Sequence, residues 1–248
     1  MAIKQWLHLS ELGSDPWVLP IYTAWNKAVA ESRAAPRPDA VTEAGLHITT
    51  RLNLVRHIMC RLNRDFSTLV KEVDKHVTKE HQYTPGHEGI ALSVDDHMKY
   101  LMIADFHSII SEVDACIDRM KIFMETLHDH VAQHITDKQR IAMINSWMKA
   151  RGIDPTWFNR LASARNFIAH VGAFYLALDT SEASWDLLLV KGNTKQFDDP
   201  STYVRVSSVM DIINGFMECR DAMQAHLIEL FETAKWPHFR EIPIEMGR

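Results

Sequence analysis

The chain has 248 residues, of which 46% are hydrophobic and 24% are charged. These fractions are ordinary for a folded globular protein and provide enough apolar side chains for a core of good size. The formal net charge of −5 argues against a surface that binds nucleic acid everywhere, so any RNA binding must depend on a local basic patch.

The cysteines and the apolar stretches bear on the cellular setting. The three cysteines, Cys60, Cys116 and Cys219, are widely separated and suggest neither a disulfide framework nor a zinc site. Residues 1–10 lack an apolar run of signal-peptide length, and the longest apolar stretch, at 167–178, is well short of the ~20 residues that a membrane span requires. We therefore expect a cytoplasmic protein with no membrane association.

Helical periodicity dominates the first part of the chain. A short helix is expected near 21–32, followed by a proline-bearing linker at 33–39, which predicts an N-terminal segment at 1–40 and a bundle domain at 41–248. From 44 to 81 apolar residues recur at spacings of three and four, which predicts one long amphipathic helix or two joined helices. The residues of this apolar stripe are Leu52, Val55, Met59, Leu62, Phe66, Leu69 and Val73. A loop is expected at 83–89.

Capping residues predict where the next helices begin. Ser93 with Asp96 resembles a capping box, and the helix after it is expected to reach about His134. Thr136 with Gln139 repeats the pattern and opens a helix that should end before Gly152.

Asp154 and Pro155 predict a further helix start, with aspartate as the N-cap and proline at the first helical position. After Asp179 two strand-like runs, 185–190 and 202–206, predict a small β-hairpin. Ser207 or Ser208 is then expected to cap a last helix that reaches about Ala234. The predicted fold is all-α, a bundle of five to six helices with a small β-hairpin before the C-terminal helix.

The segment 165–170 contains Arg165, Asn166 and His170 at the start of a run that is otherwise apolar up to Leu178. The spacing alone is weak evidence, because roughly two or three arginines followed by a histidine four to six residues later are expected by chance, and three occur. The other two are Arg51 to His57 and Arg220 to His226. The adjacent asparagine, the small Ala169 and the long apolar continuation distinguish the match at Arg165.

Over about 158–178 the sequence resembles the signature of the HEPN superfamily, whose members are helical bundles with an arginine, a polar residue directly after it and a histidine four to six residues beyond the arginine. Many of them are metal-independent ribonucleases. The resemblance implies an endoribonuclease without a cofactor, with toxin or phage-defence roles, an antitoxin protein as partner, and Arg165, Asn166 and His170 as catalytic residues in a composite site of a homodimer. The alternative is a catalytically inert HEPN-like module that binds nucleotide, RNA or a protein.

Two faces are expected on the helix that carries this motif. Asn166 and His170 are four residues apart and therefore share a face, whereas Arg165 is turned by about 140° from His170. Small residues continue the face of His170 and would let a second helix approach closely: Ala162, Ala173 and Ala177. The opposite stripe, expected in the core, consists of Phe158, Leu161, Ile168, Val171, Tyr175 and Leu178.

Two other sets of residues are candidates for a binding site. Arg51, Arg56, Arg61 and Arg64 have no acidic residue among the first three and could bind RNA, or form an ordinary solvated helix face. A metal site in a helical bundle is the rival hypothesis, because the Glu-x-x-His spacing of Glu125 and His128 and the four-residue spacing of His130 and His134 are both used by metal proteins. No second Glu-x-x-His occurs, so these histidines are alternatively surface or capping residues near a helix end.

Overall fold

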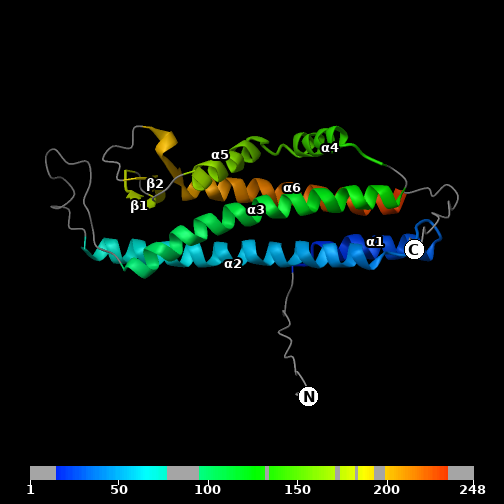
Figure 1. The fold of residues 1–248 in the computed structure, drawn as a ribbon, viewed down its shortest axis with the longest axis horizontal. Coiled ribbons are helices and arrows are strands. Elements are labelled where there is room, and N and C mark those ends of the chain that lie inside the picture. The colour runs from blue at the N-terminus through cyan, green and yellow to red at the C-terminus, as the bar shows by residue number, and fades with distance from the viewer. Residues whose placement is uncertain are drawn as a thin grey trace, which may run out of the picture.

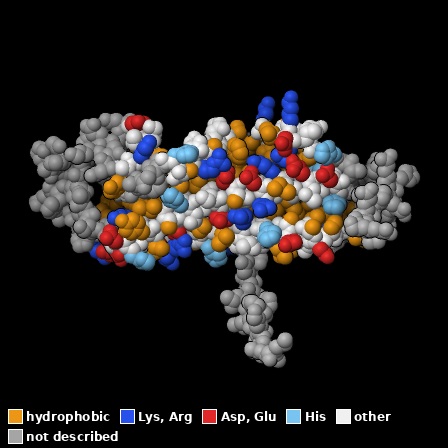
Figure 2. All heavy atoms as spheres, viewed as in Figure 1, with side chains coloured by type: hydrophobic (Ala, Val, Ile, Leu, Met, Phe, Trp, Pro, Cys, Tyr) orange, Lys and Arg blue, Asp and Glu red, His pale blue; other side chains and the backbone are white. Residues whose placement is uncertain are grey.

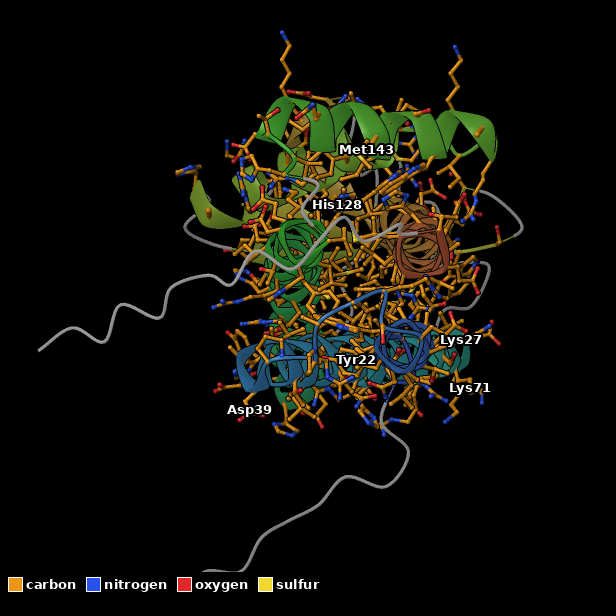
Figure 3. The ribbon with its side chains drawn as sticks, turned by 90° about the vertical axis from the view of Figure 1, so that its right-hand side faces the viewer. Tyr22, Lys27, Asp39, Lys71, His128 and Met143 are labelled. Atoms are coloured by element: carbon orange, nitrogen blue, oxygen red, sulfur yellow. The ribbon has the colours of Figure 1, made fainter. Side chains whose placement is uncertain are left out.

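The computed structural model describes residues 15–76, 95–131, 134–170, 174–181, 184–192 and 199–233. Within them six α-helices form an elongated bundle with a small antiparallel sheet before the last helix, so the predicted fold class is confirmed (Figure 1). The helices lie in three layers of two: α1 with α2, α3 with α6, and α4 with α5 (Figures 1 and 3). No helix among the described residues is long and apolar enough to cross a membrane.

The first layer contains α1 (Val18–Ala30) and α2 (Asp39–His76). The apolar stripe predicted for α2 is confirmed, since six of its seven residues are buried and Phe66 is partly buried against the core. α2 packs along α3, and α1 packs against α6, where Trp17, Ile21 and Trp25 join the same hydrophobic core. The helix that precedes the proline-bearing linker therefore shares the core of the bundle.

Capping residues define the ends of α3 (Asp96–His130) and α4 (Asp137–Ala150). The predicted cap Ser93 lies outside the described residues, and the carboxylate of Asp95 accepts the hydrogen bond from the His97 amide at 2.8 Å. The predicted capping box of Thr136 and Gln139 is confirmed, with the Thr136 amide donating to Gln139 Oε1 at 2.8 Å. α3 ends at His130, four residues earlier than predicted.

The helix with the Arg165 motif is α5 (Thr156–His170), which begins one residue after the predicted first position, Pro155. The predicted N-cap Asp154 lies two residues before the helix and accepts a hydrogen bond from the Thr156 amide at 2.9 Å. The prediction that one helical face continues through Ala173 and Ala177 was wrong. α5 ends at His170, Ala173 lies outside the described residues, and Ala177 belongs to strand β1 (Phe174–Asp179). The motif therefore occupies the last turns of a helix and is followed by a strand.

The sheet has the strand order β1-β2-β3, with β2 (Asp186–Lys191) paired antiparallel to both neighbours. The predicted hairpin strands correspond to β2 and to β3 (Tyr203–Arg205), which follows the short 3-10 helix η2 (Pro200–Thr202). The third strand, β1, was missed. Leu187, Leu188, Leu189 and Val190 of β2 are all buried, because this central strand is covered by other residues on both faces.

The last helix, α6 (Val206–Thr233), runs through the middle layer and contacts α1, α4 and α5. Its predicted caps, Ser207 and Ser208, lie in the first turn instead. Asp186 of β2 takes the capping role, because its carboxylate accepts hydrogen bonds from the Ser207 amide at 3.2 Å and from the Ser207 hydroxyl at 2.5 Å. The cap thus comes from a residue that is distant in sequence and ties the sheet to α6.

Candidate functional site

The core side of α5 determines where its polar motif points. Its buried residues recur at spacings of three and four and face α3 and α6: Trp157, Leu161, Ala164 and Ile168. At about 100° per residue, Asn166 and His170 lie roughly opposite this buried stripe, and Arg165 lies on its flank. The side chains of all three are exposed.

Arg165 is tied to the neighbouring helix. Its Nη1 atom donates to Oδ2 of Asp114 on α3 at 3.0 Å, in an ion pair whose arginine side chain is 51% exposed. The remaining guanidinium nitrogens therefore have access to solvent and to a ligand. Within one chain the guanidinium turns toward α3, whereas Asn166 and His170 turn to the solvent, so one copy alone does not gather the three groups around one point.

The predicted core stripe of α5 is confirmed in part. Leu161 and Ile168 are buried, but Phe158 is 42% exposed, and Tyr175, now on β1, is 48% exposed. Leu178 is partly buried against the core, and Val171 lies outside the described residues. The exposure of Tyr175 follows from the end of the helix at His170, after which the side-chain period changes from 3.6 to 2. Phe158 lies within α5, about 100° around the helix from the buried Trp157, at the edge of the buried stripe.

The four arginines predicted to bind RNA lie on α2. Arg51, Arg56 and Arg61 are five residues apart and point in different directions around the helix, whereas Arg61 and Arg64, three residues apart, are neighbours on its surface. Three of them are engaged by carboxylates. Arg51 Nη1 lies 2.6 Å from Glu112 Oε2, Arg61 binds Asp105 through two nitrogens, and Arg64 Nε lies 2.9 Å from Asp65 Oδ1. Arg56 is exposed and forms no ion pair with the described residues.

The surface charges of the bundle are mixed. On the face shown in Figure 2, Lys and Arg side chains lie beside Asp and Glu side chains along the body of the bundle. RNA binding by Arg51, Arg56, Arg61 and Arg64 stays a prediction, and among the four only Arg56 offers its guanidinium without an acidic partner from the described residues.

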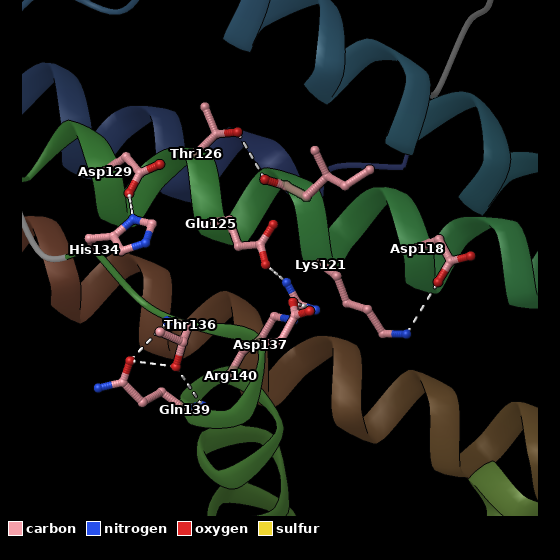
Figure 4. A network of polar contacts seen from close by, with 11 residues as sticks. Asp118, Lys121, Glu125, Thr126, Asp129, His134, Thr136, Asp137, Gln139 and Arg140 are labelled. Atoms are coloured by element: carbon pink, nitrogen blue, oxygen red, sulfur yellow. Dashed lines mark hydrogen bonds and ion pairs between the residues drawn. The ribbon is translucent and has the colours of Figure 1, made fainter.

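The residues of the predicted metal site separate in the structure. Glu125 pairs with Arg140 of α4, and His134 Nδ1 lies 2.8 Å from Asp129 Oδ1 (Figure 4). The His130 ring lies against Trp25, with centroids 5.4 Å apart. Because α3 ends at His130, His130 and His134 do not share a helical face, and no group of three or more His, Cys, Asp or Glu side chains among the described residues is arranged to hold a metal ion.

His128, the remaining residue of that set, contacts a second histidine on α6. Its Nε2 atom lies 3.0 Å from Nε2 of His226, the histidine of a chance match to Arg220. His128 is 2% exposed, and burial lowers the pKa of His226 below its ordinary value. No local pattern indicates this pair, because the two residues are 98 positions apart.

Comparison of this chain with protein-family models, with curated proteins and with solved structures finds no match. The helical bundle and the exposed polar residues at the end of α5 are therefore the basis for any functional argument.

Proposed function

We propose that this chain is a HEPN-like, metal-independent endoribonuclease that acts as a homodimer, with Arg165, Asn166 and His170 of both copies around one phosphate. The observation that carries the proposal is the exposure of all three side chains on α5. A histidine retained only for packing at the core edge would be buried, whereas His170 faces away from the buried stripe. An exposed imidazole and a solvent-accessible guanidinium are available to a phosphodiester.

The reaction would be attack of a ribose 2′-hydroxyl on the adjacent phosphorus. His170 of one copy accepts the 2′-hydroxyl proton as the bond from O2′ to phosphorus forms, and the partner subunit's His170 donates a proton to the departing 5′-oxygen as its bond to phosphorus breaks. Arg165 presents a planar set of N–H donors that match phosphate oxygens in the charged intermediate. The products are a 2′,3′-cyclic phosphate and a free 5′-hydroxyl.

A homodimer supplies what one chain lacks. Arg165 and His170 point about 140° apart on one helix. A single copy therefore offers one proton-transfer group, His170, and a guanidinium that points in a different direction. Two copies related by a two-fold axis bring together two imidazoles and two guanidinium groups. Asn166, on the same face as His170, would orient the imidazole or bind a phosphate oxygen.

The second candidate function is a catalytically inert HEPN-like module that binds nucleotide, RNA or a protein. The observation in its favour is the charge balance of α5, where Arg165 pairs with Asp114 and Arg160 pairs with Asp211 at 2.8 Å. An acidic partner beside each arginine weakens the attraction for a phosphodiester at this helix.

For the assembly we expect light scattering at tens of micromolar to give twice the chain mass of 28.5 kDa. If the site is shared, adding excess inactive His170→Ala protein to wild type should lower the cleavage rate, because mixed dimers lack one imidazole. A monomer at that concentration, or an unchanged rate after subunit exchange, would contradict the shared site.

For catalysis we expect cleavage in the presence of EDTA and a loss of at least ~100-fold in rate on His170→Ala, the lower end of what a general acid–base group contributes. The cleavage rate should fall comparably in Arg165→Ala. Arg165→Lys should recover only part of the lost rate, because an ammonium is a point charge without the planar donor set. End-group analysis should find 2′,3′-cyclic phosphates.

His47→Ala is the matched control, since His47 is an exposed histidine of α2 far from α5 in sequence and should leave the rate unchanged. Because His170 is exposed, His170→Ala should change the free energy of unfolding by no more than about 0.5 kcal/mol. If wild type cleaves no RNA and His170→Ala mainly lowers the melting temperature, the motif is structural and the inert module is favoured.

A further inference from the structure

His128 of α3 and His226 of α6 form a head-on pair between the helices of the middle layer. Their Nε2 atoms are 3.0 Å apart, their ring planes differ by 17°, and their centroids are 5.2 Å apart. With the Nε2 atoms in contact, the centroids reach their largest separation when both rings lie along the line that joins the two nitrogens. The observed separation is close to this maximum, so the two rings are nearly coplanar and their Nε2 atoms point at each other. This is the geometry of an N–H···N hydrogen bond, in which one imidazole donates and the other accepts.

α4 closes over this pair. Figure 3 shows α4 lying across α3 and α6, with His128 beneath it. The ring centroids of Trp147 on α4 and His226 are 4.5 Å apart. Few other buried side chains hold α4 in place, because Met148 is the one buried residue of this helix. The ion pair of Arg140 with Glu125 is a further link from α4 to α3 (Figure 4).

The surroundings of His226 favour its neutral imidazole, because burial lowers the pKa of this side chain. The carboxylates nearest to His128 along α3 are Glu125 and Asp129, which Arg140 and His134 already engage. The other charged or titratable side chains within a turn of the pair, or of Trp147 on α4, are His130, Lys149, Arg151 and Glu229. Lys149, Arg151 and Glu229 are exposed, and the partly buried His130 lies against Trp25.

We propose that the His128–His226 pair is an acid-sensitive latch, which holds α4 against α3 and α6 while one Nε2 proton is shared and releases α4 when both imidazoles are protonated. Two Nε2–H groups would then point at each other across 3.0 Å, so the hydrogen bond is lost and two like charges face each other.

The direction of the pH dependence follows from the lowered pKa of His226 in the closed structure. Once released, the imidazole regains an ordinary pKa of about 6.5, so the open form binds more protons than the closed form below that pH. The closed arrangement is therefore fully favoured above about pH 6.5 and loses stability as the pH falls further.

The test is amide hydrogen exchange of full-length protein at about pH 7.5 and pH 5.0, corrected for the intrinsic pH dependence of exchange, with α4 and α2 compared. We expect acidification to reduce the protection of α4 by about 10-fold, which is about 1.4 kcal/mol, and to leave the middle of α2 unchanged. In His128→Phe/His226→Phe the aromatic contact with Trp147 is kept and the acid response of α4 should fall below about 2-fold.

A second variant covers the case in which the double variant does not fold. In His226→Gln the side-chain amide can still donate to His128 but cannot take up a proton, so the acid response of α4 should again be reduced. His134→Gln, which changes only an exposed histidine paired with Asp129, should respond as wild type does. Equal protection of α4 at both pH values in wild type, or an undiminished response in His226→Gln, would overturn the latch.

Discussion

Replacing Arg61 by alanine is expected to lower the free energy of unfolding by about 3 kcal/mol, the lower part of the range for breaking a buried ion pair. The Asp105 side chain on α3 is completely buried, and Arg61 of α2 binds both of its oxygens, with Nε 2.8 Å from Oδ2. Removal of the guanidinium leaves a buried carboxylate without its counter-charge. The lower part of the range is appropriate because the Arg61 side chain is 45% exposed, which lets water reach the site in the variant. Urea unfolding followed by circular dichroism measures the change.

Arg56→Ala is the matched control on the same helix, because Arg56 is exposed and pairs with no described residue; its effect should stay within about 0.5 kcal/mol. Replacement of both partners, in Arg61→Met/Asp105→Leu, should recover most of the loss, since no buried charge remains. If Arg61→Ala weakens RNA binding while its urea unfolding curve matches that of wild type, Arg61 is a binding residue and not a structural one.

Local signals explain which elements could be predicted from the sequence. The apolar stripe of α2 and the capping box of Thr136 with Gln139 involve residues within a few positions of one another, and both are present as expected. Asp154 likewise caps α5 through its immediate neighbours. Spacing and hydrogen-bonding capacity determine such features without knowledge of the rest of the chain.

The features that were missed depend on contacts between distant parts of the chain. Phe174 to Leu178 is a short apolar run, and such a run is compatible with a helix or a strand. Antiparallel pairing of this run with β2, which aligns Tyr175 with Val190, determines the outcome. The capping of α6 by Asp186 has the same origin, because a carboxylate on the sheet occupies the position that Ser207 was expected to serve.

The candidate site was predictable only as a set of residues, and its geometry was not. The motif located Arg165, Asn166 and His170 on a helix, and helical spacing gave their directions. The end of α5 at His170 shortened the small-residue face that was expected to receive a second helix, because Ala177 lies on β1. The pairing of His128 with His226 could not be predicted, because it depends on the packing of α3 against α6 and each histidine alone resembles an ordinary polar residue.

Gly215→Ala is expected to destabilise the protein by about 3 kcal/mol, although alanine is the better helix former by about 1 kcal/mol. Gly215 lies in α6 where Trp157 of α5 crosses it, and a Cβ atom there would lie 2.7 Å from the Cβ of Trp157 and would overlap its indole ring. Trp157 is 4% exposed and its Cβ is fixed to the backbone, so relief requires a shift of α5 against α6. The clash therefore outweighs the gain in helix propensity.

A double-mutant cycle with Trp157→Ala tests this contact. Trp157→Ala alone should cost about 3–5 kcal/mol as a large-to-small core change. In that background the penalty of Gly215→Ala should become smaller but not vanish, because the indole atoms are gone while the Cβ atom of residue 157, 2.7 Å from the new methyl group, remains. Asn214→Ala, at an exposed position beside it on α6, is the control and should be neutral within about 0.5 kcal/mol. Because the crossing of Trp157 over Gly215 fixes the start of the helix that ends in His170, an undiminished penalty without the indole would mean that something else positions α5 on α6.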